Sequence, residues 1–100
     1  MGQGTKKFLA FFAKRNMYKS NIQCQEYEKF IATAERLLEV PKAKEPDFRD
    51  EIYCMLADGH YFSGDIATAV IWQERILKES KNKELIEYTK NLKRRWEQML

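Results

Sequence analysis

The chain has 100 residues and a formal net charge of +3, which fits a single domain of ordinary size. Hydrophobic residues make up 44% of it, so a modest buried core can form. With only four Gly and two Pro, the composition argues against a turn-rich β fold and favours helix.

The first predicted helix spans residues 5–19. Its aromatic side chains recur near one helical face: Phe8, Phe11, Phe12 and Tyr18. We expect this face to pack against the next helix as core. The alternative is membrane contact, because a basic helix with three Phe can lie in an anionic interface. Ser20-Asn21 predicts a break after this helix.

The second predicted helix spans residues 23–40. Apolar side chains follow the helical period along one face: Tyr27, Phe30, Ile31, Ala34, Leu37 and Leu38. Pro41 disfavours helical geometry at Val40, so the helix is expected to end there. Residues 42–45 then predict a short charged linker.

The third predicted helix begins at Pro46, whose missing N–H suits a first turn, and reaches about Tyr61 or Phe62. Acidic side chains near its start complement the helix dipole: Asp47, Asp50 and Glu51. Its buried side is predicted to carry Phe48, Ile52, Met55 and Leu56, with Tyr53 beside them.

Two further helices come after the turn Ser63-Gly64-Asp65, in which Gly64 can close one helix and Asp65 can cap the next. The fourth runs to about Glu79, and residues 80–82 predict a break. The fifth spans residues 83–99, with one apolar stripe: Leu85, Tyr88, Leu92, Trp96 and Met99. Helices joined by such short links pack as antiparallel neighbours, which fits both a flat bundle and a solenoid.

A motif over the third and fourth helices resembles the tetratricopeptide repeat: Tyr53-x-x-Leu56-Ala57-x-x-x-Tyr61-x-x-Gly64-Asp65-x-x-x-Ala69-Val70. Small residues at Ala57 and Ala69 would let the two helices approach closely. The second helix repeats the pattern weakly, with Phe30 where the family has a small residue, and residues 5–20 match no family position.

The resemblance implies an all-α fold, a short right-handed superhelix of five helices that forms one domain over residues 1–100. Its parts would be a hairpin over residues 5–40, a hairpin over 47–79 and a capping helix over 83–99. In this family the first helix of each hairpin lines a concave binding face. Here that face would carry Glu51, Cys54, Asp58, Tyr61 and Phe62.

Such a face suits a peptide or helix with apolar anchors and basic flanks. The resemblance therefore implies a non-catalytic adaptor or chaperone-like subunit whose partner is another protein. Two related readings stay open, a secretion-system chaperone and an organelle-surface adaptor. With two repeats the exposed face is large relative to the core, so a homodimer is a further expectation.

The residue pattern does not predict an enzyme, a cofactor or a metal site. His60 is the only histidine, and a structural role fits its helical position better than a general base. Cys24 and Cys54 match no metal or redox spacing and have no basic neighbour in sequence that would mark a nucleophile. There is no glycine-rich phosphate loop.

Charge is unevenly distributed along the chain. Residues 1–20 carry five bases and no acid, residues 21–77 have a net charge of −5, and residues 78–100 return to +3. Solvated helix faces are the simplest interpretation, and acidic partners or head-to-tail association the alternative. A nucleic-acid-binding helix is the alternative function, with basic contacts from Lys93, Arg94 and Arg95 and with Trp96 stacking a base.

The cysteines and the N-terminal residues are the basis for predicting the cellular compartment. Two distant cysteines and no recognisable secretory signal suggest a reducing environment, so we expect a cytoplasmic location. The longest apolar stretch, residues 8–13, is much too short to cross a bilayer.

Overall fold

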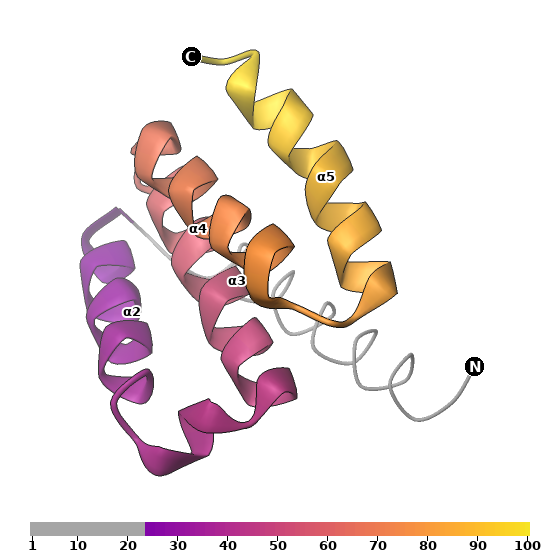
Figure 1. Ribbon diagram of the computed structural model, residues 1–100. Helices are drawn as coiled ribbons and strands as arrows, with labels where there is room; N and C mark the ends of the chain where they lie inside the picture. Colours follow the sequence, from indigo (N-terminus) through magenta and orange to yellow (C-terminus); the bar gives the residue numbers. More distant parts are fainter. Residues whose placement is uncertain (1–23) are drawn as a thin grey trace.

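The computed structural model describes residues 24–100, and this part of the chain consists of helices joined by short turns, without a strand (Figure 1). The predicted all-α class is therefore confirmed, while the helix predicted over residues 5–19 lies outside the described residues. The elements in chain order are α2 (Cys24–Leu37), the 3-10 turn η1 (Pro41–Lys44), α3 (Pro46–Phe62), α4 (Ile66–Glu79) and α5 (Lys83–Glu97).

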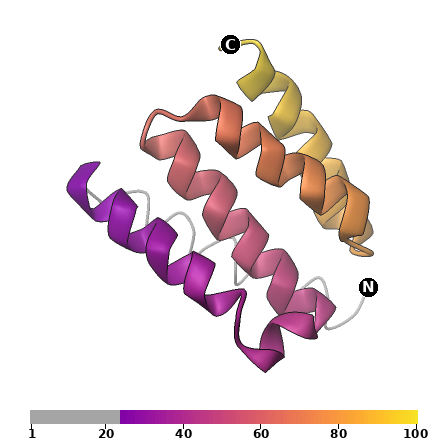
Figure 2. The same cartoon turned by 60° about the vertical axis from the view of Figure 1, so that its left-hand side comes forward.

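Successive helices run antiparallel. Figure 2 shows α2, α3 and α4 side by side in chain order, with α3 in the middle, and α5 packs against α4. Because α3 has a helix on either side, it is buried nearly all round, including Asp50, Cys54, Asp58 and Gly59. The sequence predicted one buried side for this helix, and the structure buries residues on its other sides as well.

The end of α2 differs from the prediction. The helix ends at Leu37 rather than Val40, and the next N–H groups bond three residues back, from Glu39 to Arg36 and from Val40 to Leu37. Val40 is extended, with φ −77° and ψ 151°, as expected before Pro41. The predicted linker over residues 42–45 is largely taken up by η1, which buries Ala43.

The turn between α3 and α4 forms as predicted. Gly64 has φ +98°, a conformation that other residues reach only with strain. The Asp65 carboxylate caps α4 by accepting a hydrogen bond of 3.1 Å from the Thr68 N–H. Local signals in the chain therefore set this corner.

The break between α4 and α5 also forms where the sequence predicts it. Asn82 Oδ1 caps α5 by accepting from the N–H groups of Glu84 and Leu85. The helix then ends at Glu97, slightly before the predicted Met99.

The core has its most deeply buried side chains at Ala34, Ile52, Leu56 and Ala69. Trp72 packs against all three clusters of buried residues, although the sequence pattern did not place it in the core. It lies off the residues expected along the fourth helix, which are Ile66, Ala69, Val70, Gln73, Ile76 and Leu77. That helix packs against both α3 and α5, so its buried surface is wider than one stripe.

At Gly59 the side chains of α2 lie close to the backbone of α3. A Cβ atom added there would lie 2.7 Å from Ile31 Cγ1 and 3.2 Å from Phe30 Cδ2, both of which belong to α2. Close helix approach was predicted only at Ala57 and Ala69, between α3 and α4. The role of Gly59 depends on which helix lies opposite, and the local sequence does not reveal this.

Gln73 of α4 carries an energetic cost in the core. Its side chain is 1% exposed, yet neither Oε1 nor Nε2 has a hydrogen-bond partner within residues 24–100. An amide buried without partners loses its bonds to water and gains none in return. We expect the nearly isosteric change Gln73→Met to raise the free energy of unfolding by about 1 kcal/mol, measured by urea denaturation.

Gln73→Ala is the control for this prediction. It also removes the amide but leaves a cavity, so it should be less stable than Gln73→Met. A loss of stability in Gln73→Met would show that the amide makes a favourable interaction.

Candidate partner-binding groove

Three of the five predicted binding residues lie where the C-terminal ends of α3 and α5 meet. A hollow of about 360 Å³ opens between the two helices. Its lining residues are Asp58, Tyr61, Phe62, Leu92, Arg95, Trp96 and Met99. We call this hollow the aromatic groove.

Stacked rings hold the groove in shape. Tyr61 and Trp96 lie parallel, with ring centroids 4.1 Å apart and an interplanar angle of 11°. Phe62 meets Tyr61 edge-on at 4.9 Å and stacks on Tyr27 of α2 at 6.2 Å. The Tyr61 hydroxyl donates to Met99 Sδ at 3.6 Å. These contacts fix the end of α3 against α5, so the groove is formed before any partner arrives.

The structure brings together three of the five predicted residues: Asp58, Tyr61 and Phe62 line the groove. Glu51 and Cys54 lie nearer the start of α3 and are not part of its lining. Cys54 and Asp58 are 2% and 6% exposed, so they offer a partner little surface. The apolar surface available in the groove comes mainly from the half-buried Tyr61 and Phe62 and the exposed Met99.

The α5 side of the groove was not predicted from the sequence. Leu92, Trp96 and Met99 were predicted as one stripe of the fifth helix, but as a stripe that closes the core. Their spacing was the available signal. This spacing does not show that the last turns of α5 lie against the end of α3.

The three basic residues predicted on α5 have separate environments. Lys93 Nζ lies 2.8 Å from Glu97 and 3.8 Å from Glu74, and the hydrogen bond to Glu97 raises the pKa of Lys93. Arg94 donates to Asn91 at 2.9 Å, while Arg95 lines the aromatic groove.

Trp96 was the aromatic residue expected to stack a nucleic-acid base. It is 4% exposed and already stacked on Tyr61, so its ring is not presented to a base.

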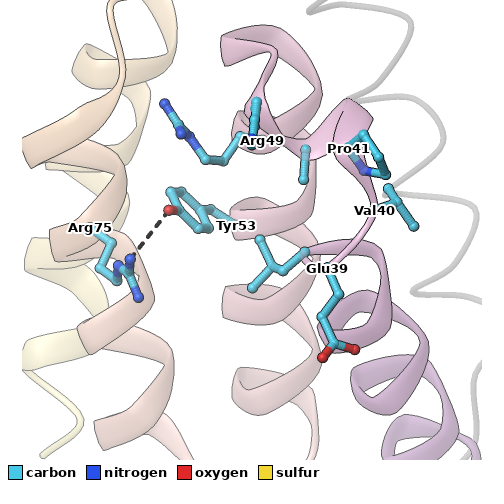
Figure 3. Close-up of a pocket in the computed structure, with 9 residues that line it drawn as sticks. Glu39, Val40, Pro41, Arg49, Tyr53 and Arg75 are labelled. Carbon is cyan, nitrogen blue, oxygen red and sulfur yellow. Dashed lines mark hydrogen bonds between the residues drawn. The ribbon is translucent and has the colours of Figure 1, made fainter.

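A second hollow, of about 450 Å³, lies where α2, η1, α3 and α4 meet (Figure 3). It is lined by Leu38, Glu39, Val40, Pro41, Ala43, Lys44, Arg49, Tyr53 and Arg75. We call it the Arg49 pocket. The sequence pattern did not predict it, because its walls come from the turn after α2, from η1, from α3 and from α4.

A hydrogen-bonded network forms one wall of the Arg49 pocket. Arg75 Nη2 donates to Tyr53 Oη at 3.4 Å (Figure 3). The Tyr53 hydroxyl donates to Glu79 Oε1 at 2.8 Å, and Arg75 Nη2 also donates to Glu79 Oε2 at 3.3 Å. The hydrogen bond from Tyr53 and the nearby guanidinium of Arg75 lower the pKa of Glu79. This carboxylate is therefore held ionised beside the two arginines.

Asp50 links α3 to the break before α5. Its buried carboxylate accepts a hydrogen bond of 2.8 Å from the Ser80 hydroxyl. Burial raises the pKa of Asp50, the Ser80 hydrogen bond offsets part of this rise, and Asp47 and Glu79 add to it. The folded protein therefore binds this proton more tightly than the unfolded chain does, so ionised Asp50 lowers stability at neutral pH.

Asp50→Asn is expected to stabilise the protein at pH 7, because the neutral amide can still accept from Ser80 without a buried charge. The favourable contribution of protonated Asp50 is present below about pH 4, the ordinary carboxyl range. It is lost as the pH rises through the higher folded-state pKa. The gain in Asp50→Asn should therefore shrink to nothing on acidification, measured as the free energy of unfolding against pH.

Glu35→Gln removes an exposed acid of α2 and is the control for Asp50→Asn. It should show no comparable pH-dependent gain. If Asp50→Asn is less stable than wild type at pH 7, the ionised carboxylate is a favourable partner of Ser80.

Metal and membrane signals are absent from the described part of the chain. Within residues 24–100 no three His, Cys, Asp or Glu side chains cluster closely enough to hold a metal ion. His60 Nδ1 lies 3.8 Å from Asp65 Oδ2. None of the described helices combines the length and the apolar character needed to span a bilayer.

No protein-family model, curated protein or solved structure matches the chain. A function for the chain must therefore be inferred from the geometry of its two hollows.

Proposed function

We propose that the chain is a non-catalytic protein-interaction module that holds a peptide or helix of a partner protein in the aromatic groove. The proposal includes a tetratricopeptide-like arrangement, with α3 and α4 as one hairpin and α5 as the closing helix. The aromatic groove carries the proposal, because it is a preformed apolar hollow with polar groups at its edge.

The lining of the groove supports an apolar anchor as the main contact of the partner. Tyr61, Phe62 and Met99 offer aromatic and thioether surface, which packs well against aliphatic and aromatic side chains. Asp58 and Arg95 supply one charge of each sign. Arg95 is exposed and would orient an acidic or backbone carbonyl group of the partner, whereas Asp58, at 6% exposed, leaves little surface for the basic flank expected from the sequence.

The test uses a peptide selected from a random display library against the purified wild-type chain. Met99→Lys places a charge in the groove at a residue that is 54% exposed, so folding should be preserved. Because burying an unpaired charge at an apolar contact is costly, we expect peptide affinity to fall at least about ten-fold. Fluorescence anisotropy with the labelled peptide measures it.

Ile71→Lys is the matched control, since Ile71 is 55% exposed and lies outside the groove. It should leave the affinity unchanged. Equal loss in both variants, or a selection that yields no binder, would rule out the groove as the recognition site.

The alternative function and the homodimer are tested with the same protein. Salt-dependent oligonucleotide binding that is lost on changing Lys93, Arg94 and Arg95 to glutamine would favour the nucleic-acid module. Light scattering determines whether the chain associates with itself.

A further inference from the structure

The Arg49 pocket is a site separate from the aromatic groove. Arg49 and Tyr53 lie one helical turn apart on α3, whereas Asp58 of the groove projects roughly 180° from Arg49 around the helix axis. The two hollows therefore open on different faces of α3 and towards different ends of it. A ligand in one does not block the other.

Charge in the Arg49 pocket is predominantly positive. Lys44, Arg49 and Arg75 line it, against the single acid Glu39. Arg75 is held in place by Glu79 and by ring contacts, with its guanidinium carbon 5.2 Å from the Tyr53 ring and 5.3 Å from the Trp72 ring. It serves as a fixed wall whose charge Glu79 largely neutralises.

Arg49 and Lys44 are the cations left to bind a ligand. Within the described residues, the one ion pair of Arg49 joins its Nε to Glu79 Oε1 at 3.8 Å, too long for a strong hydrogen bond. Lys44 forms no ion pair there. The guanidinium therefore keeps its planar pair of donors, the geometry that suits a carboxylate.

An aliphatic surface adjoins these cations. Leu38, Val40, Pro41 and Ala43 form the wall on the side of α2 and η1, and Val40 is 39% exposed (Figure 3). Lys44, Arg49 and Arg75 carry three positive charges, and Glu39 and the neighbouring Glu79 carry two negative ones. The pocket therefore has an excess of one positive charge. One carboxylate beside an aliphatic group matches this surface better than a phosphate with two negative charges.

We propose that the Arg49 pocket binds a glutamate or aspartate side chain of a partner protein, with an adjacent aliphatic residue of the same segment on the wall at Val40 and Pro41. Arg49 pairs with the carboxylate through two N–H donors, and Lys44 adds a third charge-assisted contact. The module would thus take an apolar anchor at one end of α3 and an acidic segment at the other.

The test is an NMR titration of the isotope-labelled full chain with two capped pentapeptides. One carries adjacent leucine and glutamate, and the other has glutamine in place of glutamate. We expect the glutamate peptide to shift the amide signals of Val40, of residues 42–44, and of Arg49 and Tyr53. It should bind at least about ten-fold more tightly than the glutamine peptide.

Arg49→Gln should remove this difference between the peptides. It breaks only a long, partly exposed ion pair, so the fold should be kept, and unshifted signals elsewhere check this. Lys81→Gln removes the same charge from an exposed residue outside the pocket and should leave both affinities unchanged.

Four outcomes would overturn the proposal. They are equal affinity for the two peptides, equal loss in Arg49→Gln and Lys81→Gln, shifts confined to the aromatic groove, and no shifts at about 10 mM peptide. Competition by inorganic phosphate as strong as by the glutamate peptide would assign the pocket to phosphate instead. Peptide-independent shifts that grow with protein concentration would assign it to a second copy of the chain.

Discussion

Replacing Trp96 with alanine is expected to lower the free energy of unfolding by about 3–5 kcal/mol, measured by urea denaturation followed by circular dichroism. Trp96 is 4% exposed, stacks on Tyr61 at 4.1 Å, and shares a buried cluster with Ala57, Ala69 and Val70. Its removal takes away the main contact between α5 and the end of α3. A domain of this size has about 5–15 kcal/mol of total stability, so much of it would be lost.

Trp96→Phe tests how much of this loss comes from aromatic stacking, because it keeps an aromatic ring but reduces the size of the side chain. Phenylalanine keeps an aromatic face for Tyr61, so this variant should lose clearly less stability than Trp96→Ala. Leu100→Ala, at a side chain that is 71% exposed, should change little. A loss below about 1 kcal/mol in Trp96→Ala would mean that α5 is held mainly by its contacts with α4.

Replacing Ala69 with leucine is expected to cost about 1–3 kcal/mol of stability, with a matching fall in Tm. Ala69 is 0% exposed and packs beside Ala57 in the interface between α3 and α4. A larger side chain there has no space and must push the two helices apart. The same change would distort the turn at Gly64 and the groove residues at the end of α3.

Ala67→Leu is the matched control, two residues earlier in α4 and exposed. It adds the same atoms to the same helix without overpacking, so its effect should stay within about 0.5 kcal/mol. Equal melting temperatures for Ala67→Leu and Ala69→Leu would contradict close approach of α3 and α4. The tetratricopeptide-like arrangement would then lose its physical basis.

Both hollows depend on α3, which therefore connects the proposed function with the further inference. The aromatic groove uses the last turns of α3 and the Arg49 pocket its first turns. Met99→Lys and Arg49→Gln change one hollow each, so the two proposals can fail independently.

Three of the seven residues that line the aromatic groove could be predicted as binding residues from the sequence. Asp58, Tyr61 and Phe62 were expected from the resemblance of one helix to a repeat pattern, and the structure brings them together. Cys54 lies in the core instead, with Tyr53, Ile76 and Leu85. On the α5 side, Leu92, Trp96 and Met99 were assigned to the helix stripe, and Arg95 and Trp96 to a nucleic-acid contact. None was assigned to this groove, because their contact with α3 joins segments far apart in the chain.

Most helix boundaries follow from local sequence signals. Pro46 starts α3, Gly64 and Asp65 form the next corner, and Asn82 starts α5, each through bonds or torsion angles within a few residues. The end of α2 was the exception. There Val40, the residue before Pro41, is extended, and the N–H groups of Glu39 and Val40 bond three residues back rather than four. The α-helical and the 3-10 hydrogen-bond patterns compete at helix ends, so the sequence does not fix this boundary.

Which side chains face one another depends on how the helices pack in three dimensions. The core position of Trp72, the unpartnered amide of Gln73, the close approach at Gly59 and the Arg49 pocket all depend on neighbours that are distant in sequence. Helical periodicity identifies an apolar face, but it does not identify the surface that covers it. That pairing is set by packing across several helices at once, and it creates both hollows.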